Sequence, residues 1–228
     1  MLVVLTHPND AAARALVDRW QSRGARLMVP RDLSQPGWRH YVGGCGEEWC
    51  VTSGERLRAD ALRGVVTRLP SVRVQDLPHI AAEDREYVAA EMDAFLASWL
   101  TRLRCPVLNR PVATSLLGPN RSRERWLLLA ASAGLRPAVH HSRAPGRDPA
   151  PATAAVTVVG RRWVGAVAPE LGVQAVCLAE RAGVDLLTVQ FDSPDRDAAF
   201  VCAELVIDVR SEEVADALLA RLDAGVDA

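Results

Sequence analysis

The sequence contains no lysine, and all 27 of its basic residues are arginines. Any mechanism that depends on a lysine ammonium group is therefore excluded. Arginine can take over the role of lysine as a partner for phosphate groups, because its guanidinium is always charged and donates several hydrogen bonds. The absence of lysine alone therefore leaves phosphate binding open.

The chain also lacks an excess of either charge, with a formal net charge of -1 over 228 residues. Its arginines are scattered rather than gathered in one basic run, so we expect no nucleic-acid partner. No apolar stretch approaches the length of a membrane helix. The first ten residues lack a basic leader followed by a long apolar region, so we expect a cytoplasmic protein with no membrane contact.

Cysteines are few and odd in number, which does not suit a framework of disulfide bonds. They are Cys45, Cys50, Cys105, Cys177 and Cys202. Three of them lie inside apolar runs, where a thiol behaves as a small hydrophobic group. We therefore expect free thiols.

A zinc site is conceivable near a glycine-rich loop, where His40, Cys45 and Cys50 lie close together in the sequence. Further histidines that could complete it are His79, His140 and His141. The Cys-x4-Cys spacing is looser than in zinc ribbons or fingers, and no second cysteine pair follows, so a loop thiol and a surface histidine are favoured and no metal is expected. Cys50 and His40 also suit a nucleophile and its base, but no third group that would orient the base can be identified.

The chain begins with a strand, a helix and a second strand. Residues 2–6, LVVLT, suit a strand, Asn9 is a suitable N-cap, and Gly24 ends the helix before a second apolar strand at 25–30. This order predicts two parallel strands joined by a right-handed crossover, a Rossmann-like beginning. The loop after the first strand has no GxGxxG pattern, so dinucleotide binding by that device is not supported.

The middle of the chain contains the clearest helix. From Glu83, apolar residues recur at helical spacing as far as Leu103, and acidic residues occupy the first turn, where the helix dipole favours them. Two predicted strands, 48–54 and 64–70, precede this helix, and a short strand at 106–111 follows it. Prolines at both ends of that last segment limit its length.

A second set of predicted elements begins near residue 120. They are a helix from Asn120 to Ala133, a Pro/Ala-rich connector at 143–152, a hairpin over 153–168, a helix at 173–182, a strand pair formed by 186–192 and 199–209, and a final helix after Ser211. The connector shows no periodicity and is typical of an extended or flexible link.

Six segments of the chain carry a family resemblance. They are 64–70, 84–111, 124–137, 158–169, 178–192 and 199–205. Segment 64–70 is similar to the strand of a pre-ATP-grasp domain that ends in an arginine. Segment 84–111 is similar to the long helix and the asparagine-bearing strand after it. Segment 124–137 is similar to the helix–glycine segment that leads into the ATP-grasp domain. The last three resemble the terminal subdomain of the ATP-grasp superfamily, in its peptide-modifying and glutamate-ligase-like branch.

The resemblance implies an α/β fold with a Rossmann-like pre-ATP-grasp domain at 1–112 and an ATP-grasp-like α+β domain at 113–228. In active members, a small β-rich subdomain that holds the triphosphate lies between the counterparts of 124–137 and 158–169. Here only residues 140–152 bridge those landmarks, and each strand needs about five residues plus a turn. We therefore expect a truncated domain that lacks the nucleotide-clamping subdomain.

The metal site that the resemblance implies is incomplete. Active members present an aspartate and, further along, a glutamate and an asparagine two residues apart, whose carboxylates bind magnesium. The glutamate position is Glu204, and the asparagine position is Val206. The aspartate position is Gln190 or, with a shifted alignment, Asp192. Because magnesium prefers hard oxygen ligands, we expect neither a bound metal nor a nucleotide cofactor.

Three polar residues follow predicted strands, where α/β folds usually place their ligand crevice. Arg68, Asn109 and Arg110 are therefore candidate substrate-binding residues. Arg68 could instead pair with a carboxylate such as Asp76 or Asp84, and Asn109 could merely cap a turn. Polar residues in such places bind ligands in some proteins and stabilise the fold in others, and the sequence favours neither interpretation.

A retained architecture with lost ligase chemistry predicts a catalytically degenerate protein, a pseudoenzyme that assists a peptide-modification or natural-product pathway. Two alternatives stay open: an enzyme of non-ligase chemistry that acts on a small acidic or peptide substrate, and a ligase half completed by a partner chain. Loss of the clamp would expose apolar surface of the last subdomain, so we expect a homodimer or a complex with a biosynthetic enzyme.

Overall fold

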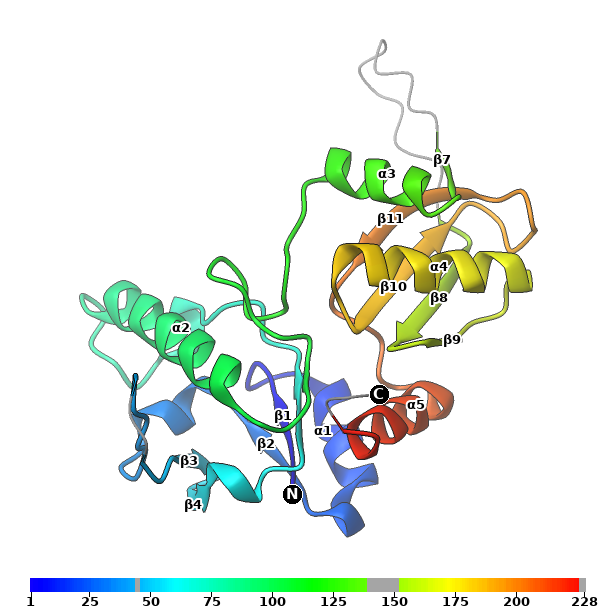
Figure 1. The fold of residues 1–228 in the computed structure, drawn as a ribbon. Helices are drawn as coiled ribbons and strands as arrows, with labels where there is room; N and C mark the ends of the chain where they lie inside the picture. The colour runs from blue at the N-terminus through cyan, green and yellow to red at the C-terminus, as the bar shows by residue number, and fades with distance from the viewer. Residues whose placement is uncertain (44–45, 139–151, 226–228) are drawn as a thin grey trace. The chain divides into compact units, whose positions relative to one another are not determined.

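The structure, a computed structural model, describes residues 1–43, 46–138 and 152–225. The chain packs into two compact units, Met1–Gly118 with Leu218–Ala228 and Pro119–Ala217, each with its own main sheet (Figure 1). The division expected from the sequence differs, because it assigned the whole C-terminal segment to the second domain. None of the helices in the described residues combines the length and the apolar character that crossing a bilayer demands.

Four parallel strands form the main sheet of the first unit, in the order β2-β1-β5-β6. They are β1 (Leu2–Leu5), β2 (Ala25–Met28), β5 (Gly64–Thr67) and β6 (Val107–Leu108). β1 and β5 are buried along their whole length, which explains why both are continuous rather than alternating apolar runs. The parallel pairing of β1 with β2 confirms the predicted β-α-β beginning.

Helix α1 (Ala11–Arg19) connects β1 to β2. Its N-cap is Asp10 and not the predicted Asn9, because the Asp10 carboxylate accepts a hydrogen bond from the Ala13 amide at 3.0 Å. Aspartate and asparagine are equally good N-caps, so composition alone could not separate the two positions. A 3-10 turn, η1 (Gln21–Arg23), follows the helix and ends at Gly24, whose φ of 69° is a left-handed conformation that suits glycine.

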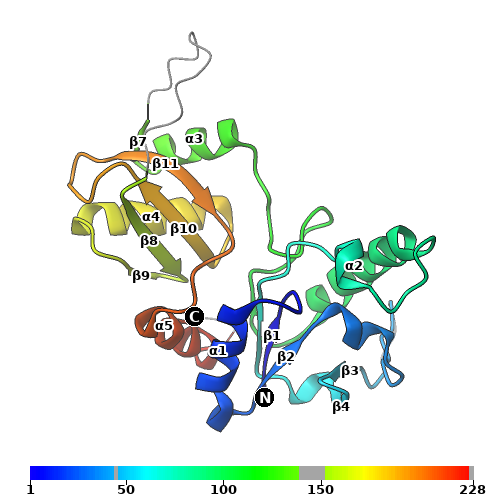
Figure 2. The same cartoon turned by 180° about the vertical axis from the view of Figure 1, so that it is seen from behind.

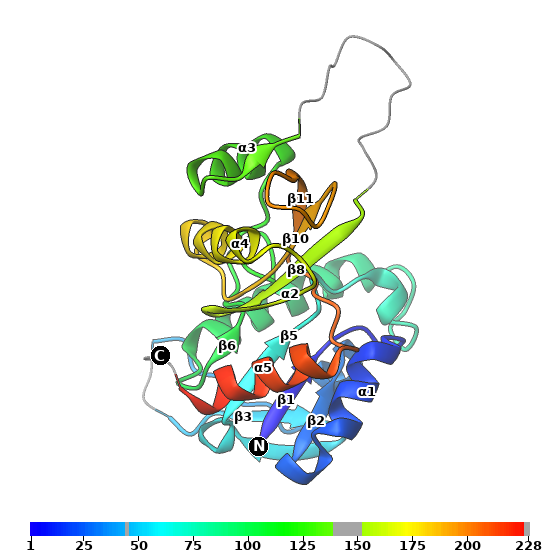
Figure 3. The same cartoon turned by 90° about the vertical axis from the view of Figure 1, so that its right-hand side faces the viewer.

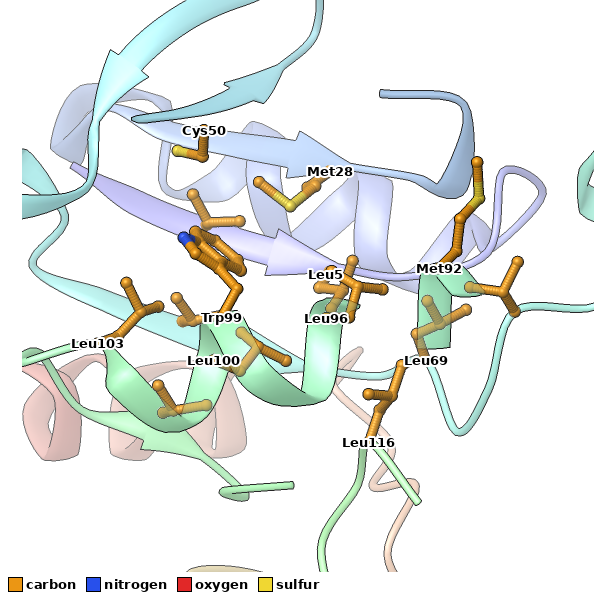
Figure 4. Packing of buried hydrophobic residues seen from close by; sticks show 14 of the residues in the cluster. Leu5, Met28, Cys50, Leu69, Met92, Leu96, Trp99, Leu100, Leu103 and Leu116 are labelled. Carbon is orange, nitrogen blue, oxygen red and sulfur yellow. The ribbon is translucent and has the colours of Figure 1, made fainter. Parts of the chain in front are cut away.

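Helix α2 (Arg85–Arg102) supplies much of the core of the first unit. Met92, Leu96 and Trp99 are buried, as the helical spacing predicted. Figure 4 shows Trp99 reaching from α2 toward the sheet, with Met28 and Cys50 on the far side of its ring.

A small hairpin of β3 (Trp49–Thr52) and β4 (Glu55–Arg58) lies between β2 and β5 in the chain. The sequence indicated β3 but not β4, because most of the β4 side chains are polar and exposed and show no apolar alternation. The remaining short helices of this unit are η2 (Pro30–Ser34), η3 (Ala59–Ala61) and η4 (Val74–Asp76).

The second unit holds a five-stranded sheet in the order β7-β11-β10-β8-β9. Its strands are β7 (Arg136–Pro137), β8 (Ala154–Val159), β9 (Arg162–Val164), β10 (Leu186–Phe191) and β11 (Ala199–Glu204). The β8–β9 and β10–β11 pairs are antiparallel, as predicted, whereas β7 runs parallel to β11. Figures 1 and 2 show the sheet from its two sides, with α4 across one face.

Helices α3 (Arg123–Ser132) and α4 (Pro169–Ala182) pack against this sheet and share its apolar core. Helix α3 begins after Ser122, whose Oγ accepts a hydrogen bond from a backbone amide, rather than at the predicted Asn120. Helix α4 begins before the predicted residue 173, because Pro169 occupies its first turn, where a missing N–H costs nothing. The predicted connector lies outside the described residues except for Ala152.

Helix α5 (Glu212–Asp223) follows Ser211, as predicted (Figure 3). Its C-terminal part belongs to the first unit. Leu222 lies so close to Gly64 of β5 that a Cβ on the glycine would come within 2.6 Å of the leucine side chain. Asp223 accepts hydrogen bonds from Arg23 and Arg63. These contacts explain why the end of the chain packs with the parallel sheet.

Candidate functional site

The carboxyl ends of the parallel strands bring candidate residues to one edge of the first sheet. Thr6 and His7 follow β1, Arg68 follows β5, and Asn109 follows β6. Neighbouring parallel strands end at the same edge, and this is where α/β sheets usually bind ligands. His7 was not among the candidates from the sequence, although its place directly after the first strand would have indicated it.

Arg68 is buried, with 8% of its surface exposed, and its Nε donates to Oδ2 of Asp10 at 2.9 Å. The same carboxylate oxygen accepts a hydrogen bond from Thr6 Oγ1 at 2.8 Å. Burial by itself raises the pKa of Asp10, but hydrogen bonds from Arg68, a backbone amide and Thr6 outweigh it and hold the pKa below its ordinary value. The ion pair considered from the sequence therefore exists, but with Asp10 and not with Asp76 or Asp84.

His7 and Asp76 form a second pair at this edge, with 2.8 Å between Nδ1 and Oδ2. Asp76 is buried and also accepts a hydrogen bond from the Arg73 amide at 3.0 Å. Burial raises the pKa of Asp76, but the contacts with Arg73 and His7 outweigh it and lower the pKa. A charged Asp76 holds the proton of neutral His7 on Nδ1, which leaves the lone pair on Nε2 to accept a hydrogen bond or a proton.

Asn109 is buried beside Gly118. A Cβ on Gly118 would lie 3.1 Å from the Asn109 side chain, and the φ of 90° at Gly118 also favours glycine. The contacts of Arg110 are with the main chain. Its guanidinium donates to main-chain carbonyls at the end of α2, which are those of Leu100, Thr101, Leu103 and Cys105. Arg110 therefore satisfies carbonyls left open at a helix C-terminus, and its role in substrate binding stays a prediction.

The predicted metal-site positions lie on β10 and β11 of the second unit. In the antiparallel register, Glu204 lies opposite Thr188, and Gln190 lies opposite Cys202. Directly opposed residues share a face of the sheet, and alternate residues along a strand do so as well. These four positions therefore present a hydroxyl, an amide, a thiol and a carboxylate on one face.

Asp192 follows β10 directly, and one oxygen of its carboxylate is engaged by the main chain. Its Oδ1 accepts a hydrogen bond from the Ala199 amide at 2.7 Å, which closes the connection between β10 and β11. Val206, at the asparagine position, is an exposed apolar residue. Magnesium demands near-octahedral coordination by hard oxygens, so the residues present do not fit that ion.

The residues considered for zinc do not come together in the described part of the chain, where no group of three or more His, Cys, Asp or Glu side chains could hold a metal ion. Cys45, His140 and His141 lie outside the described residues. Cys50 lies in the core of the first unit, and burial raises the pKa of its thiol to about 12. A thiol held protonated in this way is neither a nucleophile nor a good metal ligand.

His40 is not the surface histidine that the sequence favoured. Only 4% of its side chain is exposed, and both ring nitrogens have partners: Glu48 on Nδ1 and Ser98 on Nε2. His79 does not join these residues, and its Nε2 lies 2.9 Å from Ser34 Oγ.

Solved structures of similar fold include complexes with precursor peptides. The chain is similar to the macrocyclase MdnC bound with precursor peptide MdnA from Microcystis aeruginosa MRC, with a TM-score of 0.71 and 12% identity over 96% of this chain and 98% of that chain. The chain has the ATP-grasp fold. The ATP-grasp ligase PsnB complexed with a minimal precursor, Mg and ADP aligns with a TM-score of 0.63 and 13% identity over 97% of this chain and 98% of that chain.

A third structure with the ATP-grasp fold is the RiPP-associated ligase of Chryseobacterium gregarium in complex with ADP and a leader and core peptide. It aligns with a TM-score of 0.66 and 12% identity over 96% of each chain. No protein-family profile and no curated protein matches the sequence. Structural similarity at identities this low shows the fold alone, so the chemistry of this chain has to be argued from its own residues.

Proposed function

We propose that this chain is a catalytically degenerate ATP-grasp protein that binds a peptide and assists a peptide-modification or natural-product pathway. The observation that supports the proposal is the β10–β11 face, where Glu204 lies opposite Thr188 and Gln190 lies opposite Cys202, with the exposed apolar Val206 at the asparagine position. An ATP-dependent ligase needs metal ions that bridge the phosphates and neutralise the developing charge. One carboxylate beside an amide, a hydroxyl and a thiol is a poor magnesium site.

Two features of the sequence support the same proposal. Only residues 138–153 separate β7 from β8, which is too short for a subdomain of several strands to fold around a triphosphate. The chain also has no lysine to contact the phosphates. Arginine could serve in that role, so the metal site and the chain length weigh more than the missing lysine.

A peptide is the ligand that we favour, because each of the three related structures contains a precursor or a leader and core peptide. We keep Arg68, Asn109 and Arg110 as candidate contacts for it and place the protein in the cytoplasm. The accessory role implies a homodimer or a complex with a biosynthetic enzyme.

Calorimetric titration with magnesium-ATP tests the loss of ligase chemistry. We expect no binding heat, and clear low-micromolar binding would contradict the proposal. A second titration uses synthetic peptides that copy the short reading frames beside the gene, with scrambled peptides as matched controls. Binding of one native peptide without magnesium-ATP supports an accessory role, and binding that needs the nucleotide counts against it.

An enzyme of non-ligase chemistry is the second candidate, favoured by the His7–Asp76 pair at the same edge as Arg68. An imidazole oriented by a carboxylate is a usable general base. If this edge catalyses a reaction on a small acidic substrate, the His7→Gln variant loses turnover while its fold persists. A ligase half completed by another chain would instead regain ATP binding when co-purified with that partner from the native host.

A further inference from the structure

A charged cavity of about 600 Å³ lies in the first unit, away from the carboxyl edge of its sheet. Part of its lining comes from residues just before β5 and part from residues just before β6, and these two strands are parallel. The cavity therefore lies at the amino ends of the strands, whereas Arg68 and Asn109 follow their carboxyl ends. Its volume is in the range of small-molecule binding sites.

The cavity has an exposed rim and a more deeply buried floor. Arg58, Asp60 and Arg104 line it and are exposed. Leu103 has 4% of its surface exposed, and Glu48 has 17% of its side chain exposed. A small molecule can therefore reach the charged side chains of the rim from solvent without any change of the backbone.

The wall formed by the end of β4 and the loop before β3 carries an excess of negative charge. Arg58 donates to both carboxylate oxygens of Asp60, at 3.0 and 2.6 Å, and to Glu47 at 2.7 Å. The hydrogen bond from Arg58 holds the pKa of Asp60 below its ordinary value, which keeps this carboxylate charged. One guanidinium thus serves two exposed carboxylates, and their remaining lone pairs can accept hydrogen bonds from a further cation.

Main-chain and aromatic contacts hold this wall in place. The backbone N–H of Ala59 donates to the carbonyl of Glu48 at 2.9 Å, which joins two members of the lining. Arg58 lies opposite Trp49 in the register of β3 and β4, and its guanidinium carbon is 6.0 Å from the centroid of the Trp49 ring. Charged groups that are already positioned bind a ligand with a smaller entropic cost.

The wall formed by the end of α2 carries positive charge. Within the described residues, the guanidinium of Arg104 has no ion pair and no hydrogen bond. Arg102 is paired with Glu48, with 3.5 Å between Nε and Oε1, so we do not count it as a donor for a ligand. Arg110 donates to carbonyls at the end of α2, among them that of Leu103, and so counters the negative pole of the helix beside Arg104.

The whole lining is neutral, because it contains three arginines and three carboxylates. A ligand with a single charge would be attracted by one wall and repelled by the other. An apolar ligand would remove water from these charges and offer them no partner. We propose that the cavity binds a small zwitterion, a free amino acid or a dipeptide, with its carboxylate on Arg104 and its ammonium group on Glu47 and Asp60.

Each end of such a ligand meets the group that suits its chemistry. A guanidinium donates two parallel hydrogen bonds to a carboxylate, and the charges strengthen both bonds. An ammonium group has three donors and no acceptor, which suits a pair of carboxylates. Ala59 and Leu103 are apolar members of the lining, so the cavity tolerates a small side chain between the two charged ends.

Calorimetric titration of the full chain with glycylglycine tests the proposal. We expect saturable binding. N-acetylglycylglycine lacks the ammonium group and glycylglycinamide lacks the carboxylate, and each is expected to bind about tenfold more weakly, since each loses a charge-assisted hydrogen bond. Titration with glycine separates the two sources of the ligand: affinity at least equal to that of glycylglycine identifies a site for free amino acids, and weaker binding identifies a site for dipeptides.

Two variants assign the ends of the ligand to the two walls. Arg104→Gln is expected to weaken glycylglycine binding about tenfold and to make it equal to that of glycylglycinamide, while the preference over N-acetylglycylglycine persists. Glu47→Gln is expected to give the reverse pattern, because Arg58 is then balanced by Asp60 alone. Lost structure would remove both preferences together. Arg125→Gln, at an exposed arginine of the second unit, is the matched control with unchanged affinity.

Absence of saturable binding by both glycine and glycylglycine would overturn the proposal, and so would equal affinity for glycylglycine and its two blocked forms. The result is independent of the proposed function. A precursor peptide and its scrambled copy carry the same terminal charges, so this cavity cannot produce a difference between them. The magnesium-ATP titration concerns the second unit and a different chemistry.

Discussion

At the scale of single residues, the first unit depends on a largely buried ion pair at the carboxyl edge of its parallel sheet. Asp10 caps α1 and pairs with Arg68 at the same time. Removing one partner of a buried pair leaves the other charge uncompensated, which costs more than the pair itself contributes. We expect Asp10→Ala to lower the free energy of unfolding by about 3 to 4 kcal/mol, with about 1 kcal/mol from the lost cap.

Urea denaturation measures this loss, and Asp18→Ala, an exposed substitution on the same helix, is the matched control with little expected change. The pH dependence provides a second check. The pKa of Asp10 and of Asp76 lies below its ordinary value, so their contribution is present above the unfolded pKa, near pH 4, and is lost as the pH falls through the folded values. Equal acid stability of the native chain and Asp10→Ala would contradict this argument.

At the scale of an element, the end of α2 is stabilised by a residue that the sequence suggested for ligand binding. Arg110 donates to carbonyls in the last turn of α2 and just beyond it. A cation at a helix C-terminus is favoured by the dipole as well as by these hydrogen bonds. We expect Arg110→Ala to destabilise the protein by about 1 to 2 kcal/mol, in urea denaturation with Arg104→Ala as the neighbouring control.

The Arg110→Ala variant also distinguishes a role in capping α2 from a role in binding the peptide. If Arg110 only caps α2, peptide affinity measured well below the unfolding midpoint stays at its native value. A tenfold loss of affinity in a variant of native stability would show that Arg110 binds the ligand and that capping is secondary.

At the scale of the whole molecule, we expect self-association or a partner complex. Leu128 on α3 and Val173 on α4 belong to the same unit and are both exposed, and exposed apolar side chains of this size gain free energy when association covers them. Sedimentation velocity over a range of concentrations tests this expectation. A stable monomer at every concentration, with no partner recovered from the native host, would count against it.

Much of the fold could be predicted because it follows from local chemistry. Continuous apolar runs indicated β1 and β5, and helical spacing indicated α2. The polar strand β4 could not be found, because its pairing with β3 comes from backbone hydrogen bonds that leave no pattern in its side chains.

The sequence by itself determined the α/β class, the order of most elements, the absence of lysine and the short span between β7 and β8, since these depend on composition and on contacts between near neighbours. Only the tertiary structure decided the partners of the polar groups. Arg68 meets Asp10 across 58 positions, and His40 meets Ser98 across another 58. Such pairings depend on how strands and helices bring distant segments together, and no local spacing encodes them.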